Sequence, residues 1–205
     1  MALTKKNLQK SAIYLRHLRE NLYRKLLNIL ANFTFLTPPL MKNFKTEIKW
    51  ALIFIISSLL WVWIEKLFGL HDVYVAQHPL YTNLFGIIAI TVYILALREK
   101  RKEYFKGIMT WREGFTSGVI MTVLITILSP LAQYITYEYI SPEYFTNITE
   151  HAVEVGSMSR EDAEAYFSLR SYLIQATFGA LVMGVVTSAI VAWFVKSAAE
   201  SDRTR

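Results

Sequence analysis

The sequence predicts an all-α integral membrane protein, a four-span antiparallel helical bundle with an acidic helical outer loop. Four long apolar stretches contain no Asp, Glu, Lys, Arg or His, and the charged residues lie between them. A hydrocarbon core about 30 Å thick takes roughly 20 helical residues to cross, so each stretch is a candidate span. The uncharged stretches are Trp50–Ile64, Leu80–Leu97, Gly114–Tyr137 and Ser171–Val195.

Composition points to the same class. The chain has 205 residues, 54% of them hydrophobic and 19% charged. It contains no cysteine, which excludes disulfides, thiolate nucleophiles and thiolate-ligated metals. The net charge of +6 does not indicate a nucleic-acid binder, because the Lys and Arg residues flank apolar spans, where they meet anionic lipid headgroups. The expected partner is therefore the lipid bilayer, and no nucleic acid.

The chain divides into three parts. A membrane domain is expected over residues 41–197, and residues 198–205 form a polar tail. Residues 1–40 repeat Leu or Ile every seven positions among basic residues, which is typical of an amphipathic helix on a membrane surface. They also fit an upstream extension from a misassigned start, and both interpretations stay open. The spans are expected at about 48–68, 80–97, 114–137 and 171–195.

The distribution of Lys and Arg predicts the orientation. Residues 98–112, between the second and third spans, hold six basic residues. Residues 138–170 hold two, Arg160 and Arg170, against seven acidic ones. Basic loops stay in the cytoplasm, so both termini and residues 98–112 are expected there and residues 138–170 outside.

The acidic loop is expected to contain helices. Ser141-Pro142 is typical of a helix N-cap followed by proline, and Gly156 can end that helix. Ser159 and Asp162 have the spacing of a capping box, which predicts a second helix start. No proline or glycine lies between Arg160 and the interior of the fourth span, so this second helix is expected to continue into the span.

Small residues predict close helix packing in two spans. Spacings of four let backbones approach closely inside a membrane, where no hydrophobic drive exists between helices. We favour a contact inside the bundle over a contact with a second copy of the chain. The row in the fourth span is Ala176, Ala180, Gly184, Ser188 and Ala192, and the pair in the third is Gly114 and Gly118.

Glu65 is the acidic residue expected to lie nearest to a membrane core. It could form an ion or proton site with His71, Asp72 or His78, or it could be an interfacial charge beside Lys66; the second interpretation is favoured. His71-Asp72 and residues 150–154 contain metal-ligand types, but neither has the H-E-x-x-H form, so no metal is expected. No catalytic motif and no cofactor-binding loop is found in the sequence, and no enzyme is expected.

From Met41 onward the chain resembles the domain of unknown function 4199 family of small bacterial four-span membrane proteins. The resemblance covers residues 41–196. It implies the four-span topology and a bacterial inner membrane, and it implies no site residues. The features that carry it are Thr110-Trp111-Arg112-Glu113-Gly114-Phe115, Tyr139-Ile140-Ser141-Pro142-Glu143-Tyr144, and the small-residue-rich fourth span ending in Phe194-Val195-Lys196.

Two functions follow from these observations. The packing row, the acidic loop and the lack of a chemical motif favour a non-enzymatic assembly, scaffold or regulatory subunit that associates with itself or with another membrane protein. The alternative is a small transporter or channel for an uncharged or weakly charged solute. Transport would need the polar residues of the spans to converge on a cavity.

Overall fold

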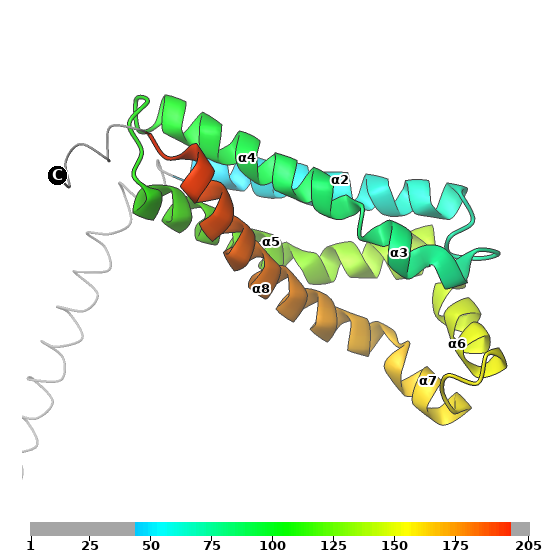
Figure 1. The fold of residues 1–205 in the computed structure, drawn as a ribbon. Helices are drawn as coiled ribbons and strands as arrows, with labels where there is room; N and C mark the ends of the chain where they lie inside the picture. Colours follow the sequence, from blue (N-terminus) through cyan, green and yellow to red (C-terminus); the bar gives the residue numbers. More distant parts are fainter. Residues whose placement is uncertain (1–43, 198–205) are drawn as a thin grey trace, which may run out of the picture. The chain divides into compact units, whose positions relative to one another are not determined.

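The computed structural model describes residues 44–197, which form helices joined by short turns, with no strand among them. The predicted segments 1–40 and 198–205 lie outside the described residues. Figure 1 shows the order of the elements along the chain. They are α2 (Lys45–Leu67), η1 (Val75–Gln77), α3 (His78–Thr82), α4 (Phe85–Glu103), α5 (Trp111–Ile135), η2 (Thr136–Ile140), α6 (Tyr144–Glu154), α7 (Arg160–Tyr166) and α8 (Leu169–Val195).

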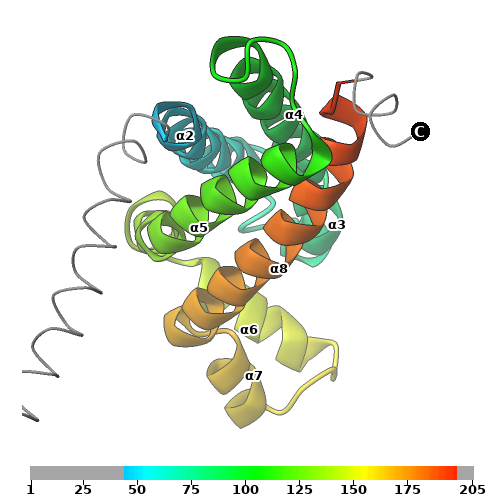
Figure 2. The ribbon, with the colours of Figure 1, turned by 90° about the vertical axis from the view of Figure 1, so that its left-hand side faces the viewer.

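The four long helices α2, α4, α5 and α8 run antiparallel to their sequence neighbours, which confirms the predicted architecture (Figure 1). Helices α2 and α8 each pack on both α4 and α5, so the four form a closed ring of neighbours (Figure 2). Four helical segments are long and apolar enough to span a membrane, and only 11% to 39% of each apolar window is buried within the protein. The remaining apolar surface faces outward, as the surface of a protein dissolved in lipid does.

The bundle has two unlike ends. We call the end that carries the α4–α5 turn and the start of α2 the terminal end, and the end that carries α3, α6 and α7 the loop end (Figure 1). At the terminal end, α5 begins with a capping box: the Thr110 hydroxyl accepts from the Glu113 N–H, and the Glu113 carboxylate accepts from the Thr110 N–H at 2.7 Å. Two of the first turn's otherwise unpaired backbone donors are thereby satisfied.

Small residues bring α5 and α8 into close contact over the half of α8 nearest the terminal end. A Cβ built on Gly184 would lie 2.4 Å from Thr122 Cγ2, so no larger residue fits there without movement. The contact is internal to the bundle, which is the arrangement that the sequence favours. The facing pairs are Gly114 with Ala192, Gly118 with Ser188, and Gly184 with Thr122.

The other half of the row does not make this contact. Ala176 and Ala180 are only half-buried, and they line a cavity of 260 Å³. Figure 1 shows α8 diverging from α5 toward α6 and α7. The two helices are therefore packed closely on the terminal side and separated on the loop side.

The acidic loop differs from its predicted form at two places. Helix α7 ends at Tyr166 and does not continue into α8, because Phe167 and Ser168 leave the helical conformation and the Ser168 hydroxyl caps α8. Ser141 does not cap α6 with its side chain; α6 begins at Tyr144 after a turn, and the Ser141 hydroxyl bonds elsewhere. The predicted start after Ser159 and the stop near Gly156, which has φ +67°, are both present.

Candidate functional site

Glu65 is buried at the loop end of α2. Its side chain is 2% exposed, so it is not an interfacial charge reaching into water beside Lys66. Trp61, one helical turn earlier, donates its indole N–H to Glu65 Oε1 at 2.8 Å. The favoured interpretation of Glu65 as a snorkelling charge was wrong, because the chain after α2 folds back over the carboxylate.

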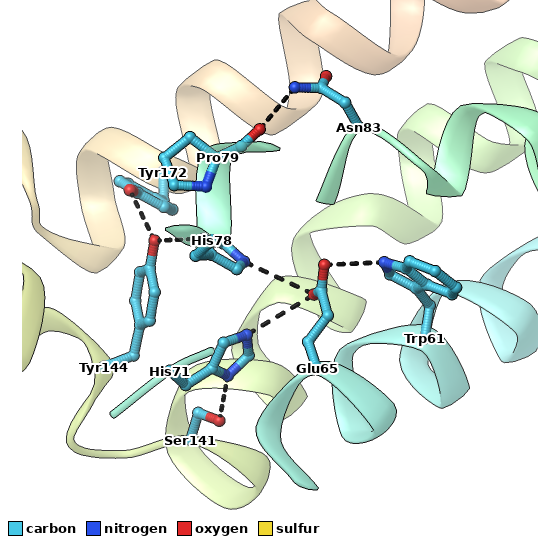
Figure 3. Close-up of polar contacts among 9 residues, drawn as sticks. All are labelled: Trp61, Glu65, His71, His78, Pro79, Asn83, Ser141, Tyr144 and Tyr172. Carbon is cyan, nitrogen blue, oxygen red and sulfur yellow. Dashed lines mark hydrogen bonds and ion pairs between the residues drawn. The ribbon is translucent and has the colours of Figure 1, made fainter. Parts of the chain in front are cut away.

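Gly69 makes that reversal possible. It has φ +74°, a conformation that glycine adopts at low cost, and it follows α2 as a helix C-terminal turn. The N–H of Leu70 donates to the carbonyl of Glu65 at 3.0 Å, which closes the turn. His71 comes next in the chain and is thereby directed onto the Glu65 side chain (Figure 3).

Two imidazoles converge on one oxygen of Glu65. His71 Nε2 and His78 Nε2 each lie 3.6 Å from Glu65 Oε2, and the three ligand atoms lie within 4.8 Å of one another (Figure 3). His71 is buried and His78 nearly so. Asp72 does not join them, because its carboxylate accepts from the Asn147 amide at 3.1 Å. We call Glu65, His71 and His78 the loop-end cluster.

Hydroxyl groups hold the other nitrogen of each imidazole. His71 Nδ1 is 2.6 Å from the Ser141 hydroxyl, and His78 Nδ1 is 3.1 Å from the Tyr144 hydroxyl. Tyr144 in turn bonds Tyr172 of α8 at 3.3 Å. Each ring is therefore fixed through Nδ1 with Nε2 facing the carboxylate, and residues of α2, α3, α6 and α8 take part (Figure 3).

Tyr144 is the central aromatic residue of the loop end. It is buried, and its ring lies edge-on to both His71 and His78, with centroids 5.1 and 5.2 Å away. Burial raises the pKa of Tyr144 above its ordinary value, and the neighbouring Tyr172 adds to the effect. Tyr144 therefore stays a neutral phenol, able to donate or accept a hydrogen bond at His78.

One hollow adjoins the cluster, and a second lies between the spans. A pocket of 380 Å³ has Glu65, Trp61, Phe68 and Tyr81 in its wall. The cavity of 260 Å³ lies between the spans and includes the polar side chains Ser58, Thr82, Ser129 and Gln133. Trp61, which bonds Glu65, stands in the wall of both hollows.

A second buried charge lies at the terminal end. Glu47 of α2 is 3% exposed and accepts from the Lys100 ammonium at 2.8 Å and from the Ser117 hydroxyl at 2.5 Å. Nearby, the Glu99 carboxylate pairs with Lys49 and accepts from the Trp50 indole at 3.1 Å. Glu47 was not expected as a site residue, because it stands between Lys45 and Lys49, which indicate the topology of the first span. Because Lys100 and Ser117 together satisfy both carboxylate oxygens of Glu47, we assign this ion pair a structural role.

His71 and His78 were expected as partners of Glu65, whereas the supporting bonds from Ser141, Tyr144 and Trp61 were not. Among residues 44–197, the loop-end cluster is the one group of three or more such side chains with ligand atoms this close. Residues 150–154 lie along α6, with Glu150 and Glu154 exposed.

Fold and site together define a multi-pass helical membrane protein with a buried acid–histidine cluster at one end of its bundle. Residues 49–197 match the family model described as "Protein of unknown function (DUF4199)", so the chain belongs to this family. This confirms the resemblance carried by the Thr110–Phe115 and Tyr139–Tyr144 segments. Searches of curated proteins and of solved structures found no match to the chain.

Proposed function

We propose that the protein is a non-enzymatic, ligand-binding regulatory subunit of the bacterial inner membrane, with its loop end outside the cell. The observation that carries the proposal is the buried loop-end cluster, which opens through Glu65 onto a pocket of 380 Å³. Buried polar groups that converge beside a concave, largely apolar pocket are the usual form of a small-ligand site.

Close packing at the terminal end supports a ligand-binding function rather than transport of a solute through the bundle. Buried apolar residues from all four spans, such as Ala51, Leu97, Met121 and Val191, fill that half of the bundle. Hydroxyls there bond one another, as Tyr93 does with Thr122 at 2.8 Å. A ligand that enters at the loop end meets a closed core. The small-residue row packs on α5 in this half, so Gly184, Ser188 and Ala192 are not the surface that a partner would use.

The environment of Ser141 supports a non-enzymatic role. Ser141, His71 and Glu65 follow one another in space as a nucleophile, a base and an acid would. The Ser141 side chain, however, is 2% exposed, so a substrate carbonyl has no approach to its oxygen. The His71–Glu65 distance of 3.6 Å is also too long for the hydrogen bond that orients a catalytic histidine. The hydroxyl serves to hold the imidazole.

The cavity between the spans favours a second candidate, a transporter of an uncharged or weakly charged solute. Its wall carries Ser58, Ser129 and Gln133, whose hydroxyl and amide groups could replace water around a small polar solute. Transport would require the packed terminal half to open in an alternate state, and this separates the two candidates experimentally.

Cysteine accessibility tests both. The chain has no cysteine, so Leu70→Cys, in the wall of the 380 Å³ pocket, and Ala192→Cys, in the packed half of α8, each introduce a single thiol at a buried position. Membranes are treated with N-ethylmaleimide, a small neutral thiol reagent. Labelling at position 70 alone supports the binding function, and labelling at both positions supports transport. If position 70 is as protected as position 192, the pocket does not admit a solute and the proposal fails.

A further inference from the structure

We propose that the loop-end cluster binds one divalent transition-metal ion of the zinc type. The ligands are Glu65 Oε2, His71 Nε2 and His78 Nε2, and one coordination position is left for a ligand from the adjoining pocket. This rests on the proposed function and names the chemistry of its site.

Two of the three separations in the loop-end cluster fit a shared central ion better than direct contact, and the third, between the two imidazole nitrogens, is within 4.8 Å. Zinc bonds nitrogen and carboxylate oxygen at about 2.0–2.2 Å, so two ligands of a tetrahedral ion stand roughly 3.3–3.5 Å apart. Both imidazole nitrogens are 3.6 Å from the same carboxylate oxygen. That distance exceeds a hydrogen bond and lies close to the edge of a zinc tetrahedron.

The hydrogen bonds to the two histidines resemble those that support metal-binding histidines in other proteins. A histidine that binds a metal through one nitrogen commonly donates its other N–H to an oxygen, which fixes the ring and its tautomer. Here Ser141 lies at Nδ1 of His71 and Tyr144 at Nδ1 of His78. With the proton on Nδ1, both Nε2 lone pairs face the carboxylate, an arrangement that a cation between them stabilises.

The buried negative charge of Glu65 also favours a bound cation. Glu65 and His71 are each 2% exposed, and an isolated buried carboxylate is costly unless a positive charge offsets it. A divalent ion supplies that charge, and Trp61 satisfies the remaining carboxylate oxygen.

The ligand types narrow the choice of ion. Two imidazoles and one carboxylate suit zinc and its neighbours among the first-row metals, whereas calcium and magnesium prefer oxygen alone. Three protein ligands leave zinc a position for water or for a bound molecule. Because Glu65 stands in the wall of the 380 Å³ pocket, a donor group of a molecule in that pocket can reach the ion.

Metal titration of the full chain tests the proposal. The protein is purified in detergent without a polyhistidine tag, stripped with a chelator, and titrated with Zn²⁺ and, as a spectroscopic probe, with Co²⁺. We expect one ion per chain, a rise in melting temperature, and the visible absorption of four-coordinate Co²⁺. His78→Gln should abolish these signals, and His151→Gln on α6 is the matched control that keeps them.

Ser141→Ala separates a metal site from a merely structural cluster. It keeps all three ligands and removes the support of His71, so Zn²⁺ affinity should fall about 10–100-fold while the stoichiometry stays at one. Absence of Zn²⁺ binding, or equal binding by wild type and His78→Gln variants that are both folded by circular dichroism, would overturn the proposal. Leu70→Cys labelling decides the proposed function independently, so its success alongside failed Zn²⁺ titration would remove the metal and keep the binding site.

Discussion

Lys100 of α4 donates its ammonium protons to both carboxylate oxygens of Glu47 on α2, at 2.8 and 3.0 Å, where both side chains are almost fully buried. The pair joins the two helices at the terminal end, and the Ser117 hydroxyl ties it to α5. The only strongly buried acid–lysine pair among the described residues thus lies at the end opposite the loop-end cluster.

Glu47→Ala should destabilise the bundle strongly. It removes the carboxylate to which Lys100 and Ser117 donate, and breaking a buried ion pair costs about 3–5 kcal/mol. Unfolding followed in detergent measures the loss. The double variant Glu47→Leu/Lys100→Met should recover much of it, because an apolar pair needs no counter-charge. A double variant that is less stable than Glu47→Ala would contradict this account.

Gly184→Leu should force α5 and α8 apart. The Cβ position of Gly184 already lies 2.4 Å from Thr122 Cγ2, and overpacking of this kind costs about 1–3 kcal/mol or more. Val182→Leu is the control, since Val182 is exposed on the same helix and should change little. Monomer stability by thermal unfolding is the measurement, and equal melting temperatures of the two variants would refute the packing assignment.

Glu65→Ala should be more harmful than Glu65→Gln. Alanine leaves the Trp61 indole and the two histidines facing an empty space, and an unsatisfied buried polar group costs about 1–3 kcal/mol. Glutamine keeps an oxygen for the Trp61 N–H and removes only the charge. Thermal unfolding of both variants in metal-free buffer tests this order, and the difference would disappear if Glu65 reached into solvent.

Orientation can be measured with two further cysteines. Lys102→Cys and Glu154→Cys place thiols at exposed positions on α4 and α6. An impermeant thiol reagent applied to intact cells should label position 154 and spare position 102, because basic loops stay in the cytoplasm. The opposite pattern would invert the topology and place the loop-end cluster inside the cell.

The four spans could be predicted because one property, an uncharged apolar stretch of sufficient length, specifies each of them. The break between α7 and α8 could not, because neither Phe167 nor Ser168 is a helix breaker and only a serine cap marks the site. The segment 80–97 was expected as one span and lies within a single candidate span, Val75–Glu103, although a turn at residues 83–84 separates the short helix α3 from α4.

The loop-end cluster was only partly predictable. Proximity in sequence suggested that His71 and His78 could meet Glu65, but their convergence depends on the reversal at Gly69 and on the contacts of Ser141 and Tyr144. Ser141 and Tyr144 lie about seventy residues after the histidines that they hold. No local pattern encodes that contact. Glu47 was missed for a related reason: its partner Lys100 was counted among the basic residues of a loop.

Close packing of α8 on α5 begins at Gly184, and this bears on how the helix moves. Gly179 lies in the separated half, its Cβ position has no neighbour within 4 Å, and glycine weakens a helix interior. Backbone amides of residues 188–195 should therefore exchange with solvent deuterium far more slowly than those of residues 169–178. Slower exchange in residues 169–178 when the loop end is occupied would show that ligand binding orders this half of α8. The other half would stay packed on α5 in both states.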